Sequence, residues 1–233
     1  MTSPFVSVII PAYNEEEYIK KTIHTVMELP YHKEVIVIND GSVDHTEDIL
    51  ITLNQIYPEP ELYLILLKKN QGKGQALARG IDKAKGDIFV FLDADLGDTI
   101  YYATKLIEPI LESVCDMTIA IFPSVMKKSG YGLVKKLAQH GIYKFTGFKC
   151  LAPLSGQRAM KRQVLSAIKR LNNGFGVEVG LTIDALKRGY HLTEIEIPFS
   201  HRETGRDLSG IMHRGKEFFQ VLFTLLLKWR MTE

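Results

Sequence analysis

The sequence predicts an α/β protein whose doubly wound, mostly parallel sheet is flanked by helices. Short apolar segments rich in Val, Ile and Leu recur through the first half of the chain and alternate with helical segments of about 10 to 15 residues. Polar clusters follow these segments, at the positions where ligands bind in such sheets. The 233 residues include 45% hydrophobic and 24% charged residues, which is typical of a globular protein with a full core.

Four of the apolar segments have the composition of strands that are buried on both faces of a sheet. They are expected at residues 6–12, 34–38, 62–67 and 88–92. The helices between them are expected to end near Glu28 and to span residues 44–55 and 72–85. We expect Asn14 to be the N-cap of the first helix, because a short polar side chain followed by three glutamates suits a helix N-terminus.

The second half of the chain is expected to add further elements. Strands are expected at residues 117–123 and 192–199, and a turn at residues 153–158 should lead into a helix. Residues 130–148 have the pattern of a basic amphipathic helix with its apolar side in the core, and contact with a membrane or an anionic acceptor is the alternative. Residues 216–230 predict an apolar helix, which we expect to pack on the core or to form a homodimer rather than to contact a membrane.

Composition argues against several classes of protein. The two cysteines, Cys115 and Cys150, form no CxxC pair or Cys/His cluster, so a disulfide framework and a structural zinc site lack support. The N-terminus lacks a signal-peptide pattern, and no apolar run reaches the roughly 18 residues of a membrane-spanning helix. We therefore expect a cytoplasmic protein, with peripheral contact at the inner face of a membrane as the alternative.

Charge is distributed unevenly along the chain. The formal net charge is +2, yet residues 117–177 contain no Asp or Glu and 11 of the 29 Lys and Arg residues. Such a segment favours an anionic partner, for example a phosphorylated substrate, a diphosphate or an acidic membrane surface. Nucleic acid is not expected as a partner, because the first half of the chain is acidic and carries no recognised base-reading motif.

Two aspartates, Asp93 and Asp95, follow the fourth expected strand. Two like-charged carboxylates this close together are costly unless a cation or hydrogen-bond donors lie between them. A divalent-metal site is one interpretation. The other is that one aspartate caps a helix beginning near Thr99 while the second is solvated.

The polar clusters after the other strands indicate which kind of ligand this edge of the sheet binds. Residues 11–15 follow the first strand, residues 39–42 the second, and Lys73 lies after the third, so all of them reach the edge of the sheet where Asp93 and Asp95 lie. A GxGxxG loop after the first strand and a GxxxxGK loop followed by Ser or Thr are both absent. A carboxylate pair beside a basic loop suits instead a nucleoside diphosphate held through a divalent cation.

Four ordered motifs resemble the donor half of family 2 glycosyltransferases, which have the GT-A fold. The motifs are SVIIPAYNEEEYI, VIVINDGSVDHT, NQGKGQALARGI and FLDADLGD, and they cover residues 5–100. The resemblance implies a single domain over residues 1–233, with a donor half at 1–100 and an acceptor half at 101–233 that includes a C-terminal loop and helix. It also implies that Asp93 and Asp95 bind Mg²⁺ or Mn²⁺ together with the donor diphosphate.

The same resemblance assigns further residues of the donor half. The residues expected to line the base and ribose pocket are Pro11, Ala12, Tyr13, Glu15 and Asp40. Lys73 is expected to approach the base or the diphosphate, and Gly72 and Ala94 belong to the same donor-binding set. A helix-start acid is the alternative role of Glu15, and a solvated loop lysine is that of Lys73.

Residues of the acceptor half complete the expected site. The resemblance places a metal-binding histidine at about His201, whose neutral imidazole is a competent third ligand. Arg202, Arg206 and Arg214 are expected to fold over the donor and exclude water. The turn residues expected to hold the sugar or an acceptor phosphate are Ser155, Gly156 and Arg158. Glu178 is a candidate base or acceptor of a sugar hydroxyl, and pairing with a nearby arginine is its alternative role.

The expected function is metal-dependent transfer of a hexose, with glucose from UDP-glucose favoured, to a small anionic, phosphorylated acceptor. Residues 173–184 and the turn at 153–156 resemble glucosyl-3-phosphoglycerate synthases, but similar turns occur in polyprenyl-phosphate sugar transferases, so a lipid phosphate is the alternative acceptor. A nucleotidyltransferase and a non-catalytic nucleotide-sugar-binding module are the alternatives of another class. Retention or inversion of the anomeric configuration and the oligomeric state stay open.

Overall fold

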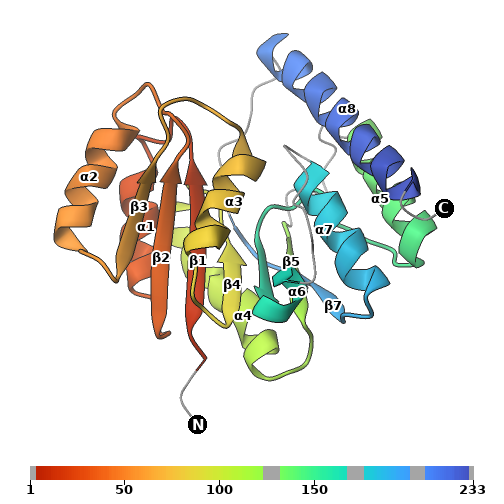
Figure 1. Cartoon of the computed structure of the whole chain (residues 1–233), viewed down its shortest axis with the longest axis horizontal. Helices are drawn as coiled ribbons and strands as arrows, with labels where there is room; N and C mark the ends of the chain where they lie inside the picture. The colour runs from red at the N-terminus through yellow and green to blue at the C-terminus, as the bar shows by residue number, and fades with distance from the viewer. Residues whose placement is uncertain (1–3, 123–131, 167–175, 200–207, 231–233) are drawn as a thin grey trace.

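The structure is a computed structural model that describes residues 4–122, 132–166, 176–199 and 208–230 (Figure 1). Within these residues, seven strands form one sheet in the order β3-β2-β1-β4-β6-β5-β7. The strands are β1 (Val6–Ala12), β2 (Lys33–Asn39), β3 (Leu62–Leu66), β4 (Ile88–Phe91), β5 (Met117–Ile121), β6 (Arg158–Lys161) and β7 (Leu192–Glu196). The helices are α1 (Ile19–Met27), α2 (Thr46–Ile56), α3 (Lys73–Lys83), the 3₁₀ helix η1 (Gly97–Ala103), α4 (Thr104–Leu111), α5 (Gly132–Thr146), α6 (Arg162–Ser166), α7 (Gly176–Lys187) and α8 (Leu208–Arg230).

Most strand pairs in the sheet are parallel. β1 pairs in parallel with β2 and β4, β2 pairs with β3, and β5 pairs with β7. Only β6, among the described strands, runs antiparallel to its neighbours, β4 and β5. The prediction of a mostly parallel sheet flanked by helices is confirmed.

The segment after the turn at residues 153–157 is a strand, so the helix predicted directly after this turn is wrong. β6 fills the gap between β4 and β5, and the short helix α6 starts only at Arg162. Ala159 and Met160 are fully buried in this position. Pairing with two neighbouring strands therefore outweighs the local helix preference of residues such as Ala, Met and Lys.

Helices cover both faces of the sheet. Along β1, Val8 and Ile10 pack into a core with α1, α2 and α4, whereas Ile9 packs into a second core with α3 and α7. A third apolar cluster joins α5, α7 and α8. Figure 1 shows the consequence for the shape of the molecule, because α2 lies at one end and α5 and α8 lie at the other.

Asn14 does not cap the first helix, contrary to the prediction. α1 begins at Ile19, with Tyr18 in the N-cap position. Asn14 instead adopts a left-handed backbone conformation with φ 57°, which asparagine tolerates better than most residues. Its backbone N–H donates to Ser42 Oγ at 3.0 Å, and its side-chain oxygen accepts from Val43 N–H at 2.9 Å. Asn14 therefore ties the loop after β1 to the loop after β2.

The antiparallel direction of β6 brings two distant loops together. Phe91 at the end of β4 pairs with Arg158 at the start of β6. The turn that enters β6 therefore lies beside the loop that leaves β4 and carries Asp93 and Asp95. No helix among the described residues combines the length and the hydropathy that crossing a membrane requires.

Candidate active site

The candidate site is centred on Asp93, which is bonded from two sides. Lys73 Nζ, at the start of α3, lies 2.6 Å from Asp93 Oδ1. The side-chain amide of Gln157, in the turn before β6, donates to Asp93 Oδ2. Gly156 lies directly against this pair, because a Cβ added there would overlap Lys73 Nζ. The structure thus brings together Lys73, Asp93 and Gly156, which the sequence predicted as site residues in three separate segments.

Glu178, in the first turn of α7, extends this cluster. Its Oε1 lies 3.8 Å from Lys73 Nζ, and its side chain is only 5% exposed. The other carboxylate oxygen, Oε2, is buried and has no hydrogen-bond partner among the described residues. Because a buried polar atom normally has a partner, this oxygen marks a place where a ligand can donate a hydrogen bond.

Burial and charge set the protonation of this cluster. Burial raises the pKa of Glu178 above its ordinary value, although Lys73 and Arg158 oppose the change. Burial alone would lower the pKa of Lys73, but the negative charges of Asp93 and Glu178 raise the pKa above its ordinary value. Lys73 is therefore a cation that lies between two acids. One of them, Glu178, is a weaker acid than an ordinary glutamate.

Arg158 is placed inside the protein rather than at the ligand edge. The side chain is fully buried, and burial lowers its pKa although the nearby acid Glu178 opposes this. The guanidinium donates to the backbone oxygen of Ser155 at 2.7 Å, to that of Glu178 at 2.9 Å and to Thr182 Oγ1 at 2.9 Å. Arg158 therefore joins the turn before β6 to α7, and we assign it a positioning role rather than the ligand contact expected from the sequence.

A second anchor of the turn comes from β7. The carboxylate of Glu194 accepts the backbone N–H of Leu151 and of Ala152, at 2.8 Å and 2.7 Å. The side-chain amide of Gln139 donates to the backbone oxygen of Cys150 at 2.9 Å. Sequence reasoning missed both Gln157 and Glu194. Gln157 could have been found by its place beside Gly156, whereas nothing distinguished Glu194 from the other acids of its strand.

Asp40, after β2, shapes the loop that carries Lys73. Its two carboxylate oxygens accept the backbone N–H groups of Gln71 and Gly72, both at 2.8 Å. Gly72 has φ 90°, which residues with a side chain rarely adopt, so this position requires glycine. Gly41 packs so closely on the backbone of Lys69 that a Cβ would clash with it. Asp40 and Gly72 therefore support the predicted donor loop through its backbone.

The loops after β1 and β4 form the remainder of the edge. Tyr13 is exposed there, while Pro11 is partly buried and Ala12 is buried. The backbone N–H of Glu15 donates to Thr46 Oγ1 at 2.8 Å, which fixes this loop on the start of α2.

The turn with Asp95 is fixed on α1. Thr22 Oγ1 donates to the backbone oxygen of Ala94 at 2.7 Å and accepts from Gly97 N–H at 2.9 Å. Asp95 is partly buried on this turn, two residues from Asp93. His201, Arg202 and Arg206 lie outside the described residues. Within the described residues, no three His, Cys, Asp or Glu side chains group as a metal site.

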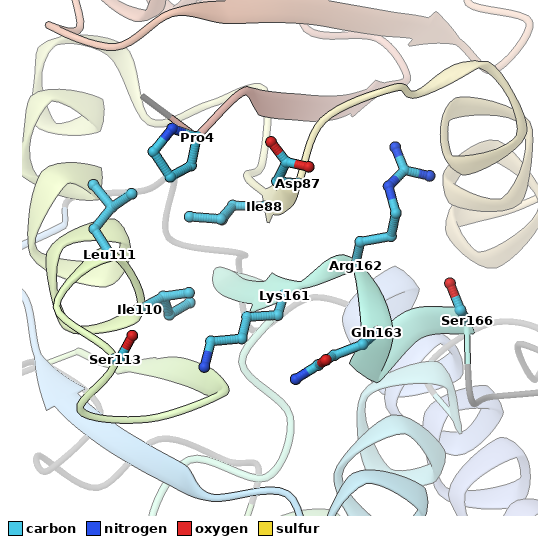
Figure 2. A pocket seen from close by; sticks show the side chains of 10 residues that line it. All are labelled: Pro4, Asp87, Ile88, Ile110, Leu111, Ser113, Lys161, Arg162, Gln163 and Ser166. Atoms are coloured by element: carbon cyan, nitrogen blue, oxygen red, sulfur yellow. The ribbon is translucent and has the colours of Figure 1, made fainter. Parts of the chain in front are cut away.

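A cavity of about 630 Å³ lies at the opposite edge of the sheet, beside the start of β4 and the end of β6 (Figure 2). Its cations are bonded to the protein itself. Lys161 Nζ lies 2.8 Å from Asp116 Oδ1, and Arg162 Nε donates to the backbone oxygen of Gly86 at 2.8 Å. The described cations of this cavity are thus occupied by the protein, and the edge with Asp93 remains the candidate active site.

Comparison with known proteins identifies the family. The model of glycosyl transferase family 2 matches residues 7–168. The chain belongs to glycosyl transferase family 2. This family 2 chain is 30% identical to a dolichol-phosphate mannosyltransferase of Pyrococcus furiosus over 96% of its length, and 31% identical to a glucosyl-3-phosphoglycerate synthase of Mycolicibacterium smegmatis over 78% of its length. It spans 64% of the length of each of these relatives.

A solved structure supports the same family placement. The glucosyl-3-phosphoglycerate synthase of Mycobacterium tuberculosis, in complex with Mn²⁺, UDP-glucose and phosphoglyceric acid, matches with a TM-score of 0.75 and 26% identity over 96% of this chain and 79% of that chain. The resemblance of the four motifs to family 2 glycosyltransferases and the predicted GT-A fold are both confirmed. The family is one of transferases, so the prediction of an enzyme of this class is confirmed as well.

Proposed function

We propose that this chain transfers a hexose, with glucose from UDP-glucose favoured, to a phosphorylated acceptor. The observation that carries the proposal is the convergence of Lys73, Asp93, Gln157 and Glu178 at the sheet edge, with one buried carboxylate oxygen left for a ligand. A cation between two acids suits a substrate that is anionic at its diphosphate and rich in hydroxyl groups at its sugar.

The donor set fits Mg²⁺ or Mn²⁺, which prefer hard oxygen ligands. Asp93 and Asp95 would hold the metal, with His201 as the expected third ligand. When bound, the metal supplies positive charge that stabilises the departing diphosphate. Lys73 and Gln157 hold the Asp93 carboxylate in one orientation, so the site is ordered before the substrate arrives.

The nucleoside part of the donor is assigned to the loops after β1 and β2. Tyr13 offers an exposed aromatic face for the base, and Pro11, Ala12 and Glu15 line the same edge. Asp40 and Gly72 position the backbone that approaches the base, and Ala94 positions the turn below the diphosphate. These contacts would orient the anomeric carbon toward Glu178.

Glu178 acts at its unpartnered oxygen. We assign Oε2 to accept a hydrogen bond from a hydroxyl of the sugar or the acceptor, and in an inverting reaction the same oxygen takes the acceptor proton. The raised pKa makes this carboxylate a better base than an exposed glutamate would be. Ser155 and Gly156 line the acceptor side of the site, in the turn that Glu194 and Arg158 hold.

Two acceptor classes fit the site. A small phosphorylated acceptor is favoured by the acid-free residues 117–177, and the similar synthase structure contains phosphoglyceric acid. A lipid phosphate is the second candidate, favoured by exposed aromatic side chains on α8 and by the similarity to a dolichol-phosphate mannosyltransferase.

Two measurements test the proposal. A thermal-shift panel of UDP-, GDP- and dTDP-sugars with and without Mn²⁺ should show a metal-dependent rise in unfolding temperature that is largest with UDP-glucose. Transfer assays with 3-phosphoglycerate and with a polyprenyl phosphate then separate the two acceptor classes. The absence of any metal-dependent shift across the panel would contradict the donor assignment, and hydrolysis without transfer would contradict the acceptor assignment.

A further inference from the structure

The helix α8 has an inner face that is fixed to the protein. Val221, Thr224 and Leu225 are buried on this face. Glycines of the neighbouring helices make room for it, because a Cβ at Gly141 of α5 would overlap Leu225 and a Cβ at Gly176 of α7 would overlap Thr224. α8 is therefore a packed part of the domain, and its opposite face is directed away from the core.

The outer face of α8 is strongly apolar although it is exposed. Phe219 is 70% exposed, Phe223 is 62% exposed and Leu226 is 53% exposed. These residues and Arg230 recur every three or four positions, so they form one stripe along the helix. A contiguous stripe of large apolar side chains on an otherwise polar surface marks a site of interaction.

The neighbouring helix α5 continues this surface with cations and further apolar groups. Leu133, Lys136, His140 and Tyr143 are all exposed on one side of α5. Lys144 Nζ lies 4.3 Å from the centre of the Trp229 ring of α8, which joins the exposed sides of the two helices. We refer to Leu133, Tyr143, Phe219, Phe223, Leu226 and Trp229 as the α5/α8 face.

The described charged side chains of α5 and α8 all carry positive charge. Residues 132–146 and 218–230 contain five Lys or Arg and no Asp or Glu. One of the cations, Lys228, is paired with Asp184 of α7 at 2.5 Å, which fixes α8 further on its inner side. The described side chains of the two helices therefore present apolar groups and unopposed positive charge to the outside.

We propose that the α5/α8 face docks on the surface of an anionic lipid bilayer. Aromatic and aliphatic side chains would enter the boundary between headgroups and acyl chains, while the lysines would contact the acidic headgroups. This arrangement lies on the membrane rather than crossing it, in keeping with an α8 whose inner face is already packed on α5 and α7.

A second copy of the chain fits this face less well. A two-fold interface places the same residues of both copies against each other. The cations of α5 and Arg230 would then meet like charges, and no acid among the described side chains of these two helices would compensate them. An anionic lipid layer supplies negative headgroups for the cations and an apolar layer in which the exposed aromatic and aliphatic side chains are buried.

The position of the face connects it to the candidate active site. Gly176 contacts α8 at Thr224, and Glu178 follows two residues later on α7. α7, which carries Glu178, therefore packs on the inner face of α8, so one helix connects the candidate site to the helix that bears the α5/α8 face. The docking proposal itself does not depend on which acceptor is used.

Trp229 provides the readout, because it is the single tryptophan of the chain and lies within the face. The full chain is titrated with vesicles of phosphatidylcholine that contain about one third phosphatidylglycerol, and with vesicles of phosphatidylcholine alone. We expect a blue shift of the Trp229 emission and sedimentation with the anionic vesicles, weaker binding to the neutral ones, and a loss of part of the affinity in about 0.5 M NaCl.

Two variants test the two components of the face. Phe219→Ala with Phe223→Ala should lower the partition coefficient at least about tenfold on anionic vesicles. Lys136→Glu with Lys144→Glu should weaken binding to anionic vesicles and leave binding to neutral vesicles unchanged, measured by sedimentation because Lys144 contacts Trp229.

Ile56→Ala with Tyr101→Ala is the matched control, because these side chains are similarly exposed but lie on α2 and η1. The control should bind vesicles like the unchanged chain, and all variants should keep its thermal midpoint. No binding by the unchanged chain, or equal binding by the phenylalanine variant, would overturn the proposal. A dimer seen by light scattering that disappears in the phenylalanine variant would overturn it too, since a second copy would then occupy the face.

Discussion

Residues 1–100, the proposed donor half, and residues 101–233, the proposed acceptor half, build the candidate site in different ways. In the donor half, polar residues directly follow the strands that present them, and the bonds of Asp40 to Gln71 and Gly72 stay within the same half. Asp93 is the exception, because Gln157 reaches it from the acceptor half. In the acceptor half, the turn before β6 is bonded to elements that are distant in sequence, because Glu194 of β7 accepts backbone N–H groups of residues 151 and 152 and Arg158 bonds to α7. Substitution of a donor-half residue such as Asp95 should therefore reduce activity alone, whereas loss of Arg158, which holds the turn, should reduce stability.

The largest effect is expected from Asp95→Asn in the donor half. The amide keeps the shape of the side chain but removes the charge that would hold the metal, so kcat/KM for transfer from UDP-glucose should fall by at least about 1,000-fold. The thermal midpoint without ligand should hardly change, because Asp95 is only partly buried. Initial rates and thermal unfolding measure the two quantities.

Asp98→Asn is the matched control for this variant. Asp98 lies on the same segment, and its exposed carboxylate pairs with Lys21 at 2.5 Å. The control should keep nearly normal kinetics. Nearly normal turnover of Asp95→Asn, or an equal loss in both variants, would contradict the metal assignment.

The next effect is on stability and is expected from Arg158→Met. Removing the guanidinium takes away its hydrogen bonds to the backbone oxygens of Ser155 and Glu178 and to Thr182 Oγ1 at a fully buried position, so the free energy of unfolding should fall by about 3 kcal/mol. Urea denaturation measures this change. Arg188→Met is the control, because its ion pair with Asp184 at 3.7 Å is partly exposed and should contribute less than about 0.5 kcal/mol. Equal effects would mean that the turn does not depend on Arg158.

A smaller loss of activity is expected from Glu178→Gln. The amide preserves the packing but cannot take a proton, so kcat should fall about 100-fold. The thermal shift with UDP-glucose and Mn²⁺ should persist. Unchanged kcat would assign Glu178 a structural role only.

The Glu178→Gln variant should also change how the free energy of unfolding depends on pH. Burial raises the pKa of Glu178, so the folded protein binds the proton more tightly than the unfolded chain does. Stability from this group is therefore greatest at low pH and falls as the pH rises from the ordinary glutamate pKa through the raised value. Glu178→Gln should lack this part of the slope when urea midpoints are measured without metal over this range.

The smallest effect is expected where the two halves touch. A Cβ from Gly156→Ala would push the Lys73 ammonium away from Asp93, so kcat/KM should fall about tenfold. Stability should change by less than about 1 kcal/mol, because only the end of a flexible side chain has to move. Gly132→Ala is the control, since an added Cβ there meets open space. Similar kinetics of the two variants would show that the Lys73–Asp93 contact does not matter for catalysis.

Much of the donor half could be predicted from sequence, because its patterns are local. The third strand, expected at 62–67, is observed at Leu62–Leu66, and Asp93 lies after β4 as expected. The direct contact of Asp93 with Lys73 was not predicted, since their order along the chain does not determine which side chains meet. Asn14 was wrongly placed as a cap because its contacts with the loop after β2 override a local rule.

The acceptor half was less predictable for a physical reason. β6 has four residues, and its place between β4 and β5 depends on packing against both. A sequence pattern this short cannot reveal an antiparallel insertion, so the turn before it was expected to enter a helix and Arg158 to reach a ligand. The roles of Arg158, Gln157 and Glu194 become apparent only when the strand is in place.

The short turn before β6 also constrains how this enzyme can diversify. The side chain of Gln157 donates a hydrogen bond to Asp93, and that of its neighbour Arg158 donates one to Thr182 of α7. The two consecutive side chains therefore bond to different parts of the protein. A residue inserted or deleted between them would shift the register and disconnect one partner or the other. Length variation that adapts the site to new acceptors is therefore expected before the segment held by Glu194, at residues 147–149, where the chain can grow without disturbing either contact.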